Sequence, residues 1–270
     1  MFWGWGRSRR RNEIASKPFP EEWDRILARG VLHVSRLPAD QQARLRKLVQ
    51  VFVAEKNWEG IRELTVTEEM KVVIAAQACL LVVGLPEDEH FDHVLSVLVY
   101  PTGYVAKDVE ITRAGVVLEG KQARIGEAWW RGPVILSWLD ARAGGRMETP
   151  GRNLVLHEFA HQLDMLNGRV TDGTPPLATS ELAERWGRVM EPAFRDLTDA
   201  CGRGYGTFID CYGATNRAEF FAVVTEMFFE RPLLLRRHWA DVYEAFRDYY
   251  GLDPVTWGIR IGSGADFDAP

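Results

Sequence analysis

The sequence predicts an α+β fold that is mostly helical and contains a small mixed sheet. Apolar side chains recur at helical spacing in the first and last thirds of the chain, whereas β-branched residues alternate with other residues only in between. The composition, 46% hydrophobic and 26% charged over 270 residues, is that of an ordinary globular domain with a substantial core. We therefore expect one domain over residues 18–250, with a helical part to about residue 90, a sheet over about 94–140 and further helices over 153–250.

Both ends are expected to lie outside this domain. Residues 1–17 carry four arginines between positions 7 and 11, behind a run of aromatic and glycine residues. A secretory signal would place its charges before an apolar run, so this order argues against one. We predict a basic flexible tail over 1–17 and a C-terminal tail over 251–270.

Three helices are expected in the first part, over 21–27, over 38–55 and from Thr67 to about Gly84. Thr67 is a natural N-cap, because its hydroxyl can accept a backbone N–H of the first turn. Gly84 and Pro86 end the third helix.

The middle of the chain has the pattern of β-strands. Alternating residues over 94–117, interrupted by Pro101-Thr102-Gly103, predict a hairpin or two short strands, and residues 132–139 predict a further strand. This last strand lies either inside the sheet or at its edge. At the edge it would pair with an extended peptide through backbone hydrogen bonds.

In the last part of the chain, four more helices are predicted, over 153–166, 181–198, 216–229 and 234–250. Gly202, Gly204 and Gly206 indicate a flexible connection between the second and the third of them.

The bulk properties exclude several classes of protein. A net charge of −5 does not suit a surface whose main task is to bind nucleic acid directly. The longest apolar stretch, residues 72–85, is interrupted by Gln77 and is too short to span a membrane. Three cysteines without a paired spacing suit a reducing compartment and predict no disulfide framework. We therefore expect a cytoplasmic protein.

The chemistry of the chain is concentrated in His157-Glu158-Phe159-Ala160-His161. The two histidines are four residues apart, so on a helix both imidazoles leave one face and can bind one zinc ion at ~2.0–2.1 Å. Glu158 lies beside them, where a carboxylate can take a proton from an attacking water. Because the flanking residues are apolar, these polar side chains are costly to bury unless they are used. The pattern predicts a zinc-dependent hydrolase, and two histidines that only form hydrogen bonds are the alternative.

A catalytic zinc site needs a third protein ligand, and no histidine follows His161 until His238. The candidates are therefore the carboxylates of Asp210, Glu219 and Glu226. We favour Glu219, which is isolated in the first turn of a strongly apolar helix; its alternative role is to interact with the helix dipole. Asp210 is the competing ligand. Glu226, about two turns further on, either supports a ligand or pairs with an arginine.

Two other side chains have candidate roles. Tyr212, seven residues before Glu219, is expected to donate its hydroxyl to the oxyanion of a tetrahedral intermediate, unless it only packs within its glycine-flanked loop. Asp164, three residues after His161, either forms a hydrogen bond with a ligating histidine or is a surface residue at the end of the helix.

These motifs resemble those of a known family. The segment His157–Asp164 (HEFAHQLD), followed by Tyr212 and then Ala218–Ala222 (AEFFA), resembles the Mlc titration factor A family of bacterial metallopeptidases. The arrangement is also similar to that of the catalytic domain of anthrax lethal factor. The resemblance extends over about residues 19–250.

The resemblance implies a gluzincin-like site, in which the helix with the two histidines packs on a second helix that bears a ligand. In such a site His157, His161 and Glu219 bind zinc, Glu158 is the base and Tyr212 is the oxyanion donor. It further implies a cytosolic aminopeptidase that binds the glucose-related repressor Mlc.

The sequence thus predicts a zinc-dependent, aminopeptidase-like enzyme that acts on peptides and also binds a transcriptional repressor of sugar uptake. The alternative is a regulatory, repressor-binding protein with a residual zinc site. The intact Glu158 favours an enzyme, because a structural zinc site needs ligands but no base. Hydrolysis of an amide other than a peptide would use the same residues.

Overall fold

The computed structural model describes residues 3–85, 91–102, 132–168 and 171–257, together with three short strands at 105–106, 109–111 and 117–119. Over these ranges the chain is mostly helical and contains two small sheets, which confirms the predicted fold class.

The described residues up to 85 form mainly helices: α1 (Trp3–Ala15), α2 (Glu21–Gly30), the 3-10 turn η1 (Val34–Arg36), α3 (Ala39–Glu55) and α4 (Glu68–Leu80). Thr67 caps α4 as expected, because its Oγ1 accepts the N–H of Met70 at 3.3 Å. Almost every residue of α4 after its first turn is buried, so this helix runs through the core of the N-terminal part.

Residues 3–15 form α1, where we expected a flexible tail. Arg11 explains the difference. Its guanidinium pairs with Glu55 on α3 at 2.7 Å and also contacts Asp92, and the Arg11 and Glu55 side chains are only 12% and 13% exposed. These ion pairs hold the basic segment against the domain, which a local pattern of charges does not reveal.

The main sheet is parallel and has the strand order β1–β2–β6, formed by β1 (Asn57–Gly60), β2 (Ser96–Tyr100) and β6 (Val134–Ser137). Among the described residues β6 therefore lies at an edge of the sheet. Of the two placements that we considered for this strand, inside the sheet or at its edge, the structure has the latter. We did not predict β1, whose sequence Asn57-Trp58-Glu59-Gly60 contains no β-branched residue. A second, antiparallel sheet consists of β3 (Val105–Ala106), β4 (Val109–Ile111) and β5 (Val117–Glu119). The rest of the predicted hairpin lies outside the described residues.

The C-terminal part is helical: α6 (Trp138–Gly145), α7 (Leu154–Asp164), α8 (Ser180–Gly202), α9 (Arg217–Glu230), α10 (Pro232–His238) and α11 (Ala240–Tyr250), with the 3-10 turns η2 (Met165–Asn167), η3 (Cys211–Ala214) and η4 (Pro254–Trp257). The helix predicted over 234–250 is interrupted at Trp239, which has φ −132° and ψ 73° and whose ring packs on Phe208 and Phe220. Trp257 is buried, so the domain extends beyond the predicted boundary at residue 250.

Cys201 and Cys211 form a disulfide bond, contrary to our prediction. The bond joins the end of α8 to η3 and bridges the glycine-rich segment that we expected to be a flexible connection. The separation of ten residues gave no signal in the sequence. The two cysteines meet because η3 packs against both α8 and α9.

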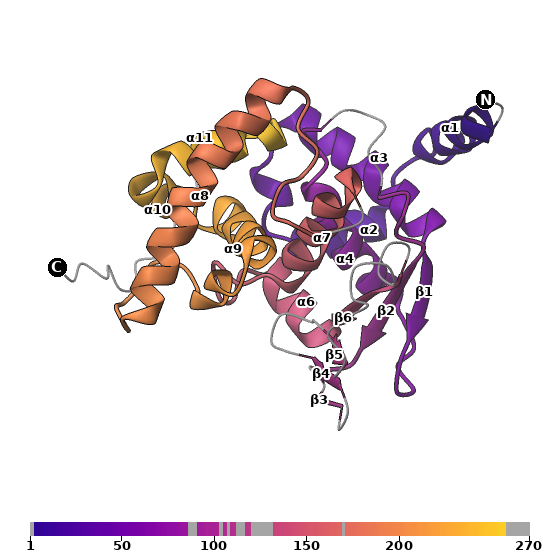
Figure 1. Cartoon of the computed structure of the whole chain (residues 1–270). Coiled ribbons are helices and arrows are strands. Elements are labelled where there is room, and N and C mark those ends of the chain that lie inside the picture. Colours follow the sequence, from indigo (N-terminus) through magenta and orange to yellow (C-terminus); the bar gives the residue numbers. More distant parts are fainter. Residues whose placement is uncertain are drawn as a thin grey trace.

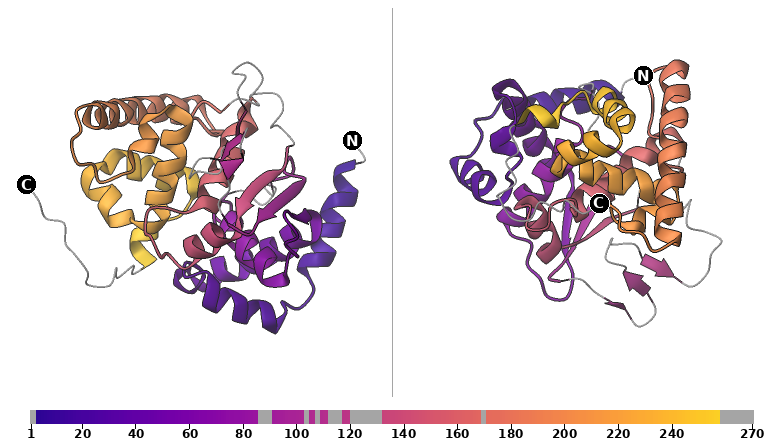
Figure 2. Two further views of the ribbon diagram at one scale, coloured as in Figure 1. Left: turned by 90° about the horizontal axis from the view of Figure 1, so that it is seen from below. Right: turned by 90° about the vertical axis from the view of Figure 1, so that its left-hand side faces the viewer.

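The helix α7 lies in the middle of the molecule, between the two parts (Figure 1). The helices α1–α4 and the parallel sheet are on one side of it, and α8–α11 are on the other; the turned views in Figure 2 show the same division. Buried apolar residues from both sides belong to one continuous core. Phe159 of α7 is part of this core, with its ring centroid 5.6 Å from that of Phe52 and 4.9 Å from that of Phe91. The motif-bearing helix is thus enclosed by both parts.

Candidate metal centre

The position of α7 follows from its cap and its apolar residues. Asn153 caps the helix, since its Oδ1 accepts the N–H of Leu156 at 3.0 Å. His157 and His161, one turn apart, are both buried, and their ring centroids are 4.9 Å apart. The apolar residues that anchor the helix in the core are Val155, Leu156, Phe159, Ala160 and Leu163.

The helix α9 packs against α7 and contributes three buried carboxylates. Asn216 caps it by accepting the N–H of Glu219 at 2.9 Å, so Glu219 lies in the first turn as predicted. Glu226 and Glu230 follow at spacings of seven and four residues, which place all three glutamates along one side of the helix.

His157, His161 and Glu219 meet between the two helices. Nε2 of His157 is 3.0 Å from Oε2 of Glu219, and Nε2 of His161 is 3.5 Å from the same oxygen. One ligand atom from each of the three residues lies within 4.8 Å of the other two. Among the described residues, these three are the group of side chains that lie close enough together to hold a metal ion.

The pKa values of the three residues show that the buried carboxylate of Glu219 requires a positive charge beside it. Burial alone would lower the pKa of His157, but hydrogen bonds to Glu219 and Glu226 raise it to about 10. Burial alone would raise the pKa of Glu219, but the hydrogen bond from His157 and the adjacent ring of His161 lower it to about 2. The pKa of His161 is lowered, first by burial. A proton on His157 therefore balances the charge of Glu219, a task that a metal cation can take over.

The donor set fits zinc, which is bound in proteins by imidazole nitrogens and carboxylate oxygens. Both ring nitrogens of His161 and Oε1 of Glu158 are shielded from solvent and form no hydrogen bond with any residue that the structure describes. Buried polar atoms without a partner are costly. In this position, a ring nitrogen of His161 can bind a metal cation, and Oε1 of Glu158 can accept a hydrogen bond from a water molecule on that cation.

Glu158 and Tyr212 both lie beside the triad. Burial raises the pKa of Glu158 to about 8; His157 opposes this shift and the charge of Glu219 adds to it. Tyr212 belongs to η3, and its ring centroid is 6.0 Å from that of His157.

A buried hydrogen-bond network behind the triad was not predicted as a whole. Oε1 of Glu226 is 2.8 Å from Nδ1 of His157, the contact that a residue supporting a ligand would make, and its other oxygen accepts the backbone N–H of Asn153. The side-chain amide of Asn153 donates to Oε1 of Glu230 and to Oε1 of Gln77, at 3.0 Å each. The network thus connects α7 with α9 and α4. Two glutamates four residues apart inside an apolar helix were the signal in the sequence.

Asp164 has neither of the roles that we considered. Its carboxylate is fully buried and accepts the N–H groups of Gly173 at 2.8 Å and Thr174 at 3.0 Å. Asp164 therefore holds the loop that follows α7. Its partners lie nine and ten residues further along the chain, beyond the reach of helical spacing.

Asp210, the competing ligand, is not part of the group of three. Its Oδ1 accepts the N–H of Tyr212 at 3.0 Å and its Oδ2 pairs with Arg152 at 2.7 Å. Asp210 thus fixes the turn that carries Tyr212.

A mostly helical α+β domain that combines His-Glu-x-x-His on one helix with a glutamate from a second helix has the architecture of a metallopeptidase. The chain belongs to the glucose-regulated metallo-peptidase M90 family, whose model matches residues 5–251.

Relatives of the chain include Mlc titration factor A from Enterobacter sp. (strain 638), which is 34% identical over 250 residues, 92% of this chain and 91% of the relative. Mlc titration factor A from Cronobacter sakazakii is 33% identical over 256 residues, 94% of this chain and 92% of that one. An uncharacterised protein from Synechocystis sp. is 34% identical over 247 residues, 91% of this chain and 89% of its own length.

In the part of the chain that the structure describes, no helix combines the length and the apolar character needed to cross a membrane.

Proposed function

We propose that the protein is a zinc-dependent peptidase that hydrolyses peptide bonds by activating a water molecule. One observation carries this proposal: His157, His161 and Glu219 bring their ligand atoms within 4.8 Å of one another. Beside them Glu158 holds an oxygen that is shielded from solvent and forms no hydrogen bond with the described residues. A structural metal site needs ligands but no such carboxylate.

His157, His161 and Glu219 would hold the zinc ion. Zinc bound there would supply a Lewis acid that polarises a carbonyl group and lowers the pKa of a water molecule. In the metal-free protein burial raises the pKa of Glu158 to about 8. A nearby cation favours the ionised carboxylate, so metal binding prepares Glu158 to act as a base.

The chain's own side chains move the protons. Glu158 takes a proton from the attacking water and returns it to the leaving amine. Tyr212, held by the N–H···O bond to Asp210, donates its hydroxyl to the oxyanion that forms on the substrate carbonyl carbon.

The surroundings support a peptide substrate with a free amino terminus, as for an aminopeptidase. A cleft of about 460 Å³ beside the triad is lined by His157 and Tyr212. Arg152 and Asp210 pair with each other there, Glu226 contacts His157, and the exposed carboxylate of Asp140 adds a negative charge at the cleft. Such a charge attracts an ammonium group.

We also propose that the protein binds a transcriptional repressor of sugar uptake similar to Mlc, and that it acts in the cytoplasm. The name Mlc titration factor A of two relatives at 33–34% identity supports this proposal. A pull-down of the purified protein with the Mlc-like repressor of its host tests it.

The peptidase proposal is tested with Glu158→Gln. The variant should keep zinc but lose activity on amino-acid p-nitroanilides by about 10²-fold or more, because Gln cannot accept the proton. Chelator should abolish the activity of the wild type. Glu181→Gln, an equivalent change at an exposed position, is the control. Full activity in Glu158→Gln would refute the mechanism; absence of activity in a zinc-loaded wild type that binds the repressor would favour the regulatory alternative.

A further inference from the structure

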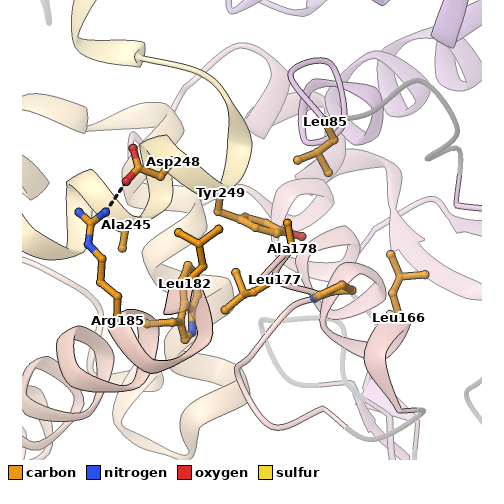
Figure 3. A pocket seen from close by; sticks show the side chains of 11 residues that line it. Leu85, Leu166, Leu177, Ala178, Leu182, Arg185, Ala245, Asp248 and Tyr249 are labelled. Atoms are coloured by element: carbon orange, nitrogen blue, oxygen red, sulfur yellow. Dashed lines mark hydrogen bonds and ion pairs between the residues drawn. The ribbon is translucent and has the colours of Figure 1, made fainter. Parts of the chain in front are cut away.

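A second cavity, of about 320 Å³, lies between α8, α11 and the loop that follows α7. Its walls are largely apolar, and one of its ends is formed by an ion pair. Figure 3 shows this pair, Arg185 of α8 and Asp248 of α11, at one end and Leu85 and Leu166 at the other, with Leu177 and other apolar side chains between them.

The floor of the cavity is fixed by the rest of the structure. Trp186 donates its indole N–H to the carbonyl of Gly173 at 3.1 Å and stacks on Phe246 with ring centroids 5.1 Å apart. The adjoining loop is held by Asp164, which accepts the N–H groups of Gly173 and Thr174. The cavity is therefore preformed, as ligand sites usually are.

The charges at the polar end are balanced. Arg185 pairs with Asp248, and Arg247 contacts both Asp248 at 3.5 Å and Glu244. Two cations and two anions give no net charge. The Arg185 and Asp248 side chains are 41% and 34% exposed, so separating their ion pair costs little.

We propose that this cavity binds a free apolar α-amino acid, such as leucine or phenylalanine. The carboxylate of the ligand would pair with Arg185, its ammonium group with Asp248, and its side chain would lie along the apolar wall. A simple apolar carboxylate would add one uncompensated negative charge to this balanced group, and an apolar amine would add one uncompensated positive charge. The volume, at the low end for ligand cavities, suits a single amino acid.

The proposed site is separate from the candidate metal centre, and amino-acid binding there does not depend on the proposed reaction. The cavity is nevertheless connected to α7 through two of its lining residues. Leu166 lies two residues beyond the end of α7, and Leu177 lies in the loop that Asp164 holds. A bound amino acid would therefore contact the segment on which the end of α7 rests.

Isothermal titration calorimetry of the full chain with L-leucine and L-phenylalanine tests the proposal. Saturable binding is expected. Glycine, leucinamide and 4-methylpentanoate, which lack the side chain, the carboxylate and the ammonium group respectively, should each bind at least about tenfold more weakly.

Variants assign the binding to this cavity. Arg185→Gln and Asp248→Asn should weaken leucine binding about tenfold or more, whereas Arg188→Gln, an exposed change one turn further along α8, should not. Ala178→Trp, at an exposed wall position, should block binding by filling the cavity. Thermal unfolding shows whether each variant is folded.

Leucine bound at the metal centre as a reaction product would give a different result. That binding would disappear with chelator and would not respond to Arg185→Gln, and this outcome would overturn the proposal. Failure of leucine to bind at millimolar concentration, or equal binding of leucine and 4-methylpentanoate, would overturn it too. None of these results bears on the Glu158→Gln test of the peptidase.

Discussion

At the scale of single residues, His157 is held from both sides of its ring. Nδ1 is 2.8 Å from Glu226 and Nε2 is 3.0 Å from Glu219. A carboxylate on the far nitrogen fixes the ring orientation and leaves Nε2 as the nitrogen that would face a metal ion. Glu219 and Glu226 therefore have different tasks, although both are buried glutamates on one helix.

The choice between the two candidate carboxylate ligands is tested by Glu219→Ala and Asp210→Ala. Glu219→Ala should lower zinc affinity by more than about 100-fold, because it removes a proposed ligand. Loss of a residue that only supports a ligand lowers metal affinity by about 100-fold at most. Asp210→Ala should keep zinc at full stoichiometry, since Asp210 pairs with Arg152. Elemental analysis of the dialysed proteins measures both. Zinc retained in the first variant and lost in the second would show that Glu219 is not the ligand.

Tyr212→Phe should lower kcat by about 10²-fold with little change in KM, because the hydroxyl acts on an oxyanion that exists only beyond the ground state. Zinc content should stay unchanged. Tyr205→Phe, which removes the same hydroxyl from a tyrosine that is 63% exposed, is the matched control. Equal kinetics for the two variants would assign Tyr212 a packing role only.

The spacing of His157 and His161, and the isolation of Glu219 in an apolar helix, were visible in the sequence. The partners of Asp164 and Asp210 were not. Asp164 binds backbone N–H groups of a loop, and Asp210 pairs with Arg152, a residue far away in the chain. Such contacts depend on where loops lie and leave no periodic pattern.

At the scale of elements, α7 and α9 are aligned by Asn153. This residue caps α7 with its side-chain oxygen and donates its amide N–H groups to Glu230 of α9 and Gln77 of α4. Both helices of the candidate metal centre are thus aligned by one buried side chain, which is 1% exposed.

Asn153→Ala should lower the free energy of unfolding by about 2–4 kcal/mol, as the sum of a lost cap and buried groups left without partners. Asn216→Ala is the control, because Asn216 caps α9 from an exposed position; it should cost only about 1 kcal/mol. Urea denaturation of the metal-free proteins measures the difference. An equal loss of unfolding free energy in both variants would show that Asn153 acts only as a helix cap.

Helices that have a clear cap and a periodic apolar face, such as α4, α7 and α9, were predicted close to their observed bounds. The helix α1 and the strand β1 were missed because they depend on distant partners. Ion pairs from Arg11 to Glu55 and Asp92 hold α1, and backbone pairing with β2 defines β1. The break at Trp239 likewise follows from the packing of its ring on Phe208 and Phe220.

At the scale of the whole molecule, metal binding is linked to protonation. In the metal-free protein His157 has a pKa of about 10, above its ordinary value of 6.5. Its contribution to stability is therefore fully present below pH 6.5 and is lost as the pH rises from 6.5 to 10. Zinc bound by His157 would need the neutral imidazole, so it would displace a proton throughout this range.

Zinc binding between pH 6.5 and 9 should therefore release a proton from His157, and apparent affinity should rise with pH. Over the same range the metal-free protein should become less stable. Calorimetric titration of metal-free protein in buffers of different ionisation enthalpy counts the protons, and thermal unfolding follows the stability. Binding enthalpies that do not depend on the buffer would contradict the link.

The helix α7 shows why its five-residue motif is not a self-contained unit. Asn153 before it, Glu226 beside it and Asp164 at its end all bind it to other segments. A designer who copied only His-Glu-x-x-His onto another scaffold would transfer the two histidines without the hydrogen-bond partners that orient them. Transplanting the centre would require both helices, with Gln77 or an equivalent amide from a third, so the smallest portable form of this site is a three-helix fragment.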